Sequence, residues 1–185
     1  MNPEHRPCRA RGLTLVELLI GISMLSILVA LAAPDFGGWL RSYRLTLQSN
    51  DFTSALAYAR SEAVRRGTRV ALCKSANPLA PNPACTTAGS WTAGWLVFAD
   101  NVHVAGNAAG TVDGTDTVLR VGEAMQGAAI TADANLGNWM AYTPDGLALS
   151  GGGSAAGNIK LCQGRSAQTV TLNTVGRVST AKSTC

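Results

Sequence analysis

The stretch RGLTLVELLIGISMLSILVALAA, residues 11–33, decides the fold of this chain. From Leu13 onward it is an apolar run of 21 residues whose single charged side chain is Glu17. As a helix this run is about 31 Å long, close to the thickness of bilayer hydrocarbon. The short segment before it is polar and basic, which favours a cytoplasmic N-terminus. We therefore predict one membrane helix at the start of the chain.

Glu17 is the unusual residue of the apolar run. A carboxylate at the centre of a membrane helix costs a few kcal/mol, so such residues are functional by default. Cleavage between Gly12 and Leu13 would create an amine one helical turn before Glu17. We hypothesise that Glu17 neutralises the amine of a neighbouring subunit during assembly. The alternative for this segment is an ordinary secretory signal that ends at Ala32 and Ala33.

Residues 11–19 resemble the class III signal of type IV pilins and pseudopilins, although Leu13 replaces the commoner phenylalanine. The resemblance implies a prepilin peptidase that cuts after Gly12 and N-methylates Leu13. It also implies an assembly role for Glu17 and for Pro34, which stands where the family has its helix-kinking proline. The implied partners are other pilins in a filament, the peptidase and an assembly platform of the inner membrane. The implied location is the inner membrane, with a single span and a periplasmic head, and then a pilus or pseudopilus.

Helical spacing resumes after Pro34 and predicts a helix that ends near Arg66, with Gly67 as its C-cap. Its apolar stripe consists of Leu45, Phe52, Leu56, Ala59 and Ala63. We divide the chain into a leader (1–12), a transmembrane and assembly helix (13–34), the amphipathic half of that helix (35–67) and a β-rich head (68–185).

The head reads as a series of short strands. Candidates are residues 69–73, 91–99, 117–121, 139–143, 159–163, 169–173 and 175–180, while the glycine-rich residues 151–157 are expected to be flexible. The fold class is therefore α+β, with the helix packed on an antiparallel sheet. Residues 60–67, 70–73, 94–98 and 176–178 resemble the GspH/FimT/FimU group of minor pilins and pseudopilins. The resemblance implies the type IV pilin fold.

Four cysteines remain once Cys8 is removed with the leader. An even number in an exported domain favours two disulfides over four reduced thiols. Four cysteines allow three connectivities, and proximity favours Cys73–Cys85 with Cys162–Cys185.

Residues with catalytic patterns are not found, and we predict a protein that is not an enzyme and needs no cofactor or metal. His5 lies in the leader, and His103 is interpreted as a solvated side chain in a polar loop. The segment Asp113-Gly114-Thr115-Asp116 is interpreted as a turn, because it lacks the further carboxylates and spacing of a Ca²⁺ loop.

The charges are unevenly distributed. Removal of the leader, with three arginines and one glutamate, lowers the net charge from +4 to +2. Residues 100–145 contain six acids, whereas residues 160–185 contain no acid and four cations, Lys160, Arg165, Arg177 and Lys182. In FimT-like pilins a basic G-R-x-R motif is associated with DNA binding. Gly176-Arg177-Val178 resembles it, but Ser179 stands in place of the second arginine, and a solvated sheet edge is the other interpretation.

The resemblance, taken with these observations, predicts a minor pilin of a type IV pilus that acts in pilus initiation or at the tip. One alternative is a GspH-like pseudopilin of a type II secretion system. The other is a FimT-like pilin that binds DNA weakly in natural transformation.

Overall fold

The helix α1, Leu15–Arg66, begins at a capping box and ends at a glycine. The Glu17 N–H donates to Thr14 Oγ1 at 3.2 Å, and Glu17 Oε2 accepts from the Thr14 N–H at 3.2 Å. These reciprocal bonds satisfy two of the free donors at the helix start. Gly67 has φ +64° and donates its N–H to the Ala63 carbonyl at 3.0 Å. The helix end is thus the one predicted from Gly67.

The computed structural model describes residues 12–101, 108–151 and 153–185, without the side chains of residues 32–35. Residues 1–11 and His103 lie outside the described residues, as does the side chain of Pro34. The chain divides into two compact units, residues 1–40 and 41–185.

In the first unit, the apolar side chains of α1 have little cover. From Leu15 to Leu31 the large ones are 50–74% exposed. Within the described residues, no single helix has the length and hydropathy of a membrane span, whereas Leu15–Leu31 and Phe36–Arg66 have them together as a bent pair.

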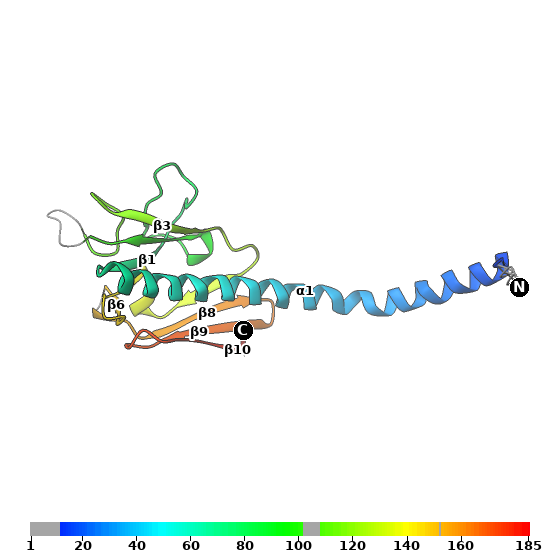
Figure 1. Cartoon of the computed structure of the whole chain (residues 1–185). Coiled ribbons are helices and arrows are strands. Elements are labelled where there is room, and N and C mark those ends of the chain that lie inside the picture. The colour runs from blue at the N-terminus through cyan, green and yellow to red at the C-terminus, as the bar shows by residue number, and fades with distance from the viewer. Residues whose placement is uncertain (1–11, 102–107, 152) are drawn as a thin grey trace, which may run out of the picture. The chain divides into compact units, whose positions relative to one another are not determined.

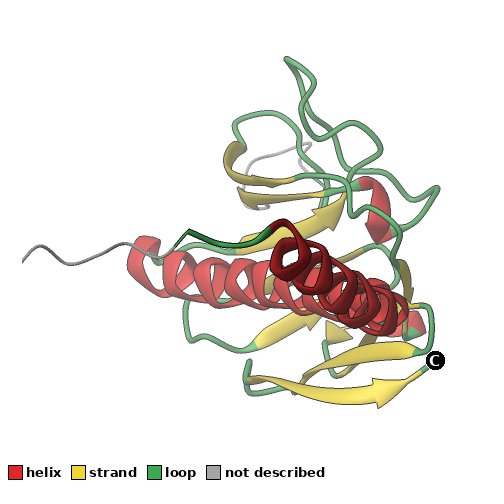
Figure 2. Cartoon of the chain, turned by 90° about the vertical axis from the view of Figure 1, so that its right-hand side faces the viewer, coloured by secondary structure: helices red, strands yellow, loops and turns green. Residues whose placement is uncertain are grey.

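The second unit contains two antiparallel sheets beside α1 (Figures 1 and 2). The larger sheet has the order β3-β2-β1-β5-β6-β7: Thr117–Gly122, Trp95–Ala99, Val70–Lys74, Trp139–Tyr142, Ala148–Ser150 and Gly153–Ser154. The smaller sheet has the order β10-β9-β8-β4: Val178–Thr184, Ser166–Leu172, Gly157–Gln163 and Ala129–Ala132. Two short 3₁₀ helices, Trp91–Ala93 and Ala134–Leu136, lie between strands.

The predicted stripe of α1 forms the centre of the core. All five of its residues are at most 1% exposed, and they join one apolar cluster with side chains of both sheets. Phe52 meets the rings of Trp91 and Trp95 edge-on, at centroid distances of 5.6 and 6.4 Å. The α+β class and the antiparallel head are confirmed.

The strand predictions differ from the structure in several places. Residues 91–93 form a 3₁₀ turn rather than the start of a strand, because Ser90 caps it through the Thr92 N–H. The last strand begins at Val178 and runs on to Thr184, through a polar segment with no apolar alternation. The segment expected to be flexible contains β7 and the first residue of β8, and β4 and β6 were not predicted.

Two disulfides fasten the head. The structure confirms Cys73–Cys85, with Cα atoms 5.6 Å apart. It also joins Cys162 of β8 to Cys185, the residue after β10, with Cα atoms 5.8 Å apart. The second bridge therefore spans β9 and ties the end of the edge strand β10 to the interior of its sheet.

Replacement of Cys162 and Cys185 by serine together should lower the free energy of unfolding by about 3 kcal/mol, because a closed loop of this length is released. Denaturant unfolding of the whole chain in detergent measures the loss. Amide exchange should rise selectively in β10. In the matched control, Cys73→Ser with Cys85→Ser, β10 should keep its protection; equal exchange in both variants contradicts the assignment.

The last turn of α1 predicts a pH dependence of stability. Arg65 donates two hydrogen bonds to the buried Glu62, at 3.0 and 2.6 Å, and Arg66 donates one at 2.7 Å. These bonds, those from Arg65 first, lower the pKa of Glu62 from 4.5 to about 2. A lowered pKa in the folded state stabilises the fold above pH 4.5, and this contribution is lost as the pH falls towards 2.

Thermal unfolding of Glu62→Gln against pH tests this expectation. The variant should be less stable than the parent near neutral pH, and the difference should shrink below pH 4.5. If the stability difference between the parent and Glu62→Gln stays constant down to pH 2, the pKa of Glu62 is not lowered in the folded state.

Candidate assembly motif and head groove

The predicted cleavage bond, Gly12–Leu13, lies directly before the first turn of α1. Gly12 and Leu13 are exposed and outside the helix, and Leu13 is 78% exposed. A peptidase needs an accessible bond, and this bond is exposed and lies outside the helix.

The carboxylate of Glu17 is occupied within its own chain. Its Oε2 accepts from both the N–H and the hydroxyl of Thr14, at 3.2 and 3.1 Å. Glu17 therefore has a local role as the helix cap, beside the assembly role that the sequence predicts. The capping pattern T-x-x-E, residues 14–17, could have been found from the sequence.

The four C-terminal cations do not come together. Lys160 pairs with Thr169 of β9, whereas Lys182 pairs with the neighbouring Gln168, so their side chains point to opposite faces of the small sheet. Arg165 and Arg177 lie at opposite ends of β9, which with seven residues is about 23 Å long.

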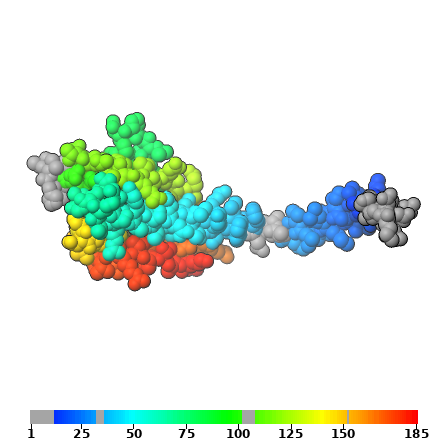
Figure 3. Space-filling model, in the orientation of Figure 1, coloured from blue at the N-terminus to red at the C-terminus, as the bar shows by residue number. Residues whose placement is uncertain are grey.

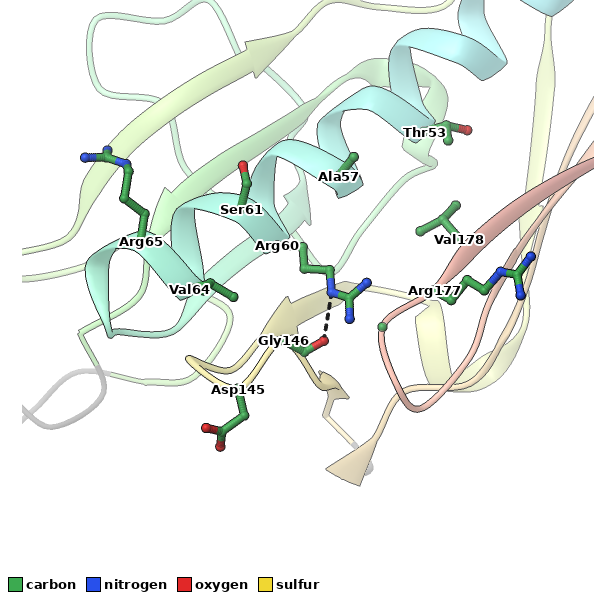
Figure 4. A pocket seen from close by; sticks show the side chains of 11 residues that line it. Thr53, Ala57, Arg60, Ser61, Val64, Arg65, Asp145, Gly146, Arg177 and Val178 are labelled. Atoms are coloured by element: carbon green, nitrogen blue, oxygen red, sulfur yellow. Dashed lines mark hydrogen bonds between the residues drawn. The ribbon is translucent and has the colours of Figure 1, made fainter.

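Arg177 instead lies beside residues that are distant in the sequence. An open groove of about 700 Å³ is bounded by one face of α1 and by two turns (Figure 4). Its lining includes Thr53, Ala57, Arg60, Ser61, Val64 and Arg65 of α1, with Asp145, Gly146 and residues 176–178. No local sequence pattern could have predicted this groove, because three separate segments build it.

Arg60 fixes the two turns to the helix. Its Nε donates to the Gly146 carbonyl at 3.1 Å, and its Nη2 donates to the Val175 carbonyl at 3.0 Å. The guanidinium thus satisfies main-chain acceptors of both turns and sets the shape of the groove.

Gly176 is required by the packing of these turns. Its φ is +79°, and a Cβ there would collide with the Gly146 carbonyl oxygen and lie 3.0 Å from the Tyr142 ring. The glycine that the sequence assigns to a basic motif therefore has a structural role of its own.

Comparisons with known proteins agree with this architecture. The family model of the type II transport protein GspH matches residues 48–176, and the model of the prokaryotic N-terminal methylation motif matches residues 8–33. Two crystal structures of the type IV minor pilin FimU of Pseudomonas aeruginosa (strain PAO1) are similar in fold, each with a TM-score of 0.51 over 74% of this chain. Their identities are 16% and 18%, and 92% and 87% of the FimU chains are covered. No curated protein matches the chain.

Gly176→Ala should lower the free energy of unfolding by at least about 2 kcal/mol, because it combines a left-handed φ with a clash against backbone. Gly164→Ala is the matched control, since Gly164 has φ +64° and open space around its Cβ position. It should cost only about 1 kcal/mol. Thermal unfolding compares the two, and equal losses would remove the packing argument.

Proposed function

Because the chain belongs to the family of the type II transport protein GspH, we propose that it is a minor pilin of a type IV pilus, acting in pilus initiation or at the tip. The observation that carries the proposal is a helix whose first part exposes its apolar side chains. This helix begins at the Thr14–Glu17 cap, and its second part belongs to a small two-sheet head. Such a helix needs lipid or other helices around it. The role is structural rather than catalytic.

The proposed life of the chain has two stages. The precursor lies in the inner membrane with its head in the periplasm, and a prepilin peptidase cuts the Gly12–Leu13 bond and N-methylates Leu13. An assembly platform then transfers α1 from lipid into the helix bundle of a filament, where other pilins cover it. Pro34 would kink the helix in this packing, which stays a prediction from its position.

Glu17 has a proposed role in the transfer. A carboxylate surrounded by apolar side chains is costly in lipid, and a neighbouring subunit's amine would compensate its charge. The cap with Thr14 satisfies hydrogen bonds of the carboxylate but leaves its charge. The driving force for assembly therefore includes the pairing of Glu17 with the new amine of another subunit.

A pseudopilin of a type II secretion system is the second candidate, and the family's own description favours it. Deletion of the gene separates the two, because a pilin mutant loses pili and a pseudopilin mutant loses exoprotein secretion. A role in DNA uptake has less support, since the four cations are spread over both faces and both ends of the small sheet.

Charge and capping at Glu17 can be tested separately. Glu17→Gln keeps an acceptor for Thr14 but removes the charge, whereas Thr14→Val removes the hydroxyl and keeps the charge. The glutamine variant should insert in the membrane but fall at least tenfold in sheared filaments, the equivalent of about 1.4 kcal/mol. Thr14→Val should still be incorporated.

Immunoblots of membrane and filament fractions measure incorporation, and N-terminal sequencing of the processed chain should read from Leu13. Normal incorporation of Glu17→Gln would remove the proposed charge pairing. A mature chain that begins elsewhere would contradict the filament role as a whole.

A further inference from the structure

The edge strand β10 has one row of main-chain groups that faces away from its sheet. The Asn173 N–H donates to the Arg177 carbonyl at 3.1 Å, and the Cys185 N–H donates to the Arg165 carbonyl at 3.4 Å. Hydrogen-bonded pairs alternate along an antiparallel ladder. The residues between them therefore direct their N–H and C=O groups outward: Val178, Thr180, Lys182 and Thr184.

The head groove, defined by the lining of α1 and the two turns, reaches the start of this edge, where Val178 lines it. A hydrogen bond of 3.4 Å joins the hydroxyl of Thr53 in α1 to the hydroxyl of Thr180 in β10. The helix presents the small side chain of Ala57 there, and Val178 points from β10 towards α1 (Figure 4). Figure 3 shows the red C-terminal strand on the surface next to this part of the helix.

Exposed apolar side chains lie in the groove and next to it. Val64, which lines the groove, is 56% exposed, and Val175, in the turn before β10, is 55% exposed. An extended chain beside β10 would place every second side chain towards α1, where the small residues leave room. The other side chains would face solvent, so the groove fits a segment of alternating polarity.

The charged residues that line the groove indicate which charge a bound segment should carry. Arg60, Arg65 and Arg177 line it, against the single acid Asp145. Arg65 forms a salt bridge with Glu62, whereas Arg177 is exposed. Residues 160–185 contain no acidic side chain. An acidic side chain near the Arg177 end would complement this surface.

We propose that the free edge of β10 accepts an extended segment of a partner protein, with alternating apolar residues and an acidic residue near Arg177. Main-chain hydrogen bonds to Val178 and Thr180 give affinity, and the groove gives specificity. Lys182, a residue type that discourages edge pairing, lies beyond the groove and leaves this part open. Such a contact would be made by the head alone and is separate from the filament role of α1.

A proline substitution distinguishes the free edge from the paired one. Thr180→Pro removes an outward N–H and no bond to β9, a position where sheets tolerate proline. Thr180→Val is the matched control, because it keeps the N–H. The full-length protein in detergent is titrated with a fluorescent eight-residue peptide that alternates valine and threonine and carries aspartate at one end.

The peptide should bind the parent and Thr180→Val within twofold of each other, and bind Thr180→Pro at least tenfold more weakly. Arg177→Gln should weaken binding about threefold or more for the aspartate peptide, and not for its asparagine version. Amide exchange of the parent should show new protection at residues 178 and 180 with the peptide, a measurement that stands even where the proline variant fails to fold.

Three results would overturn the proposal. The first is no binding to the parent up to about 1 mM peptide. The second is binding that Thr180→Pro leaves unchanged, with no protection at residues 178 and 180. The third is an absence of peptide binding together with another interaction that Thr180→Pro abolishes. If that interaction is self-association measured by sedimentation, the occupant is a second copy of the chain. If it is binding of a single-stranded oligonucleotide, the occupant is a nucleic acid. Filament incorporation is measured separately and fails or succeeds independently.

Discussion

The contact on which the head depends is the packing of one stripe of α1 against two sheets that share no strand. Leu45, Phe52, Leu56, Ala59 and Ala63 join a single apolar cluster with residues of both sheets. A sheet stays folded only when its apolar face is covered. Because the same helix has large apolar side chains exposed between Leu15 and Leu31, one element must serve two surroundings, protein at one end and lipid or neighbouring helices at the other.

The sequence predicts the parts of the molecule in which a single residue or a strong period controls the structure. Gly67 ends the helix, the stripe from Leu45 to Ala63 has helical spacing, and Cys73 and Cys85 are close along the chain. The strands β4, β6 and β7 have only two to four, mostly small, residues. Their sequences show no alternation of apolar and polar residues that could have predicted a strand. The polar β10 is held by its ladder and by a disulfide, and neither has a hydrophobic signature.

The candidate sites divide in the same way. The motif around Gly12 and Glu17 is local, so its residues could be named from the sequence, and the capping geometry agrees with the T-x-x-E pattern. The C-terminal cations were grouped because they are close in sequence, and strand alternation separates them. The head groove is assembled from residues near 60, 146 and 177, and only the three-dimensional fold brings Arg60 to the two turn carbonyls.

The bridge from Cys162 to Cys185 has a mechanical consequence. A load on an exposed edge strand tends to peel it away one ladder bond at a time. Here Cys185, directly after β10, is covalently joined to β8, two strands inward, so tension on β10 from its C-terminal side passes to the middle of the sheet. Formation of this disulfide would thus decide how much pulling force the outer strand of this head withstands.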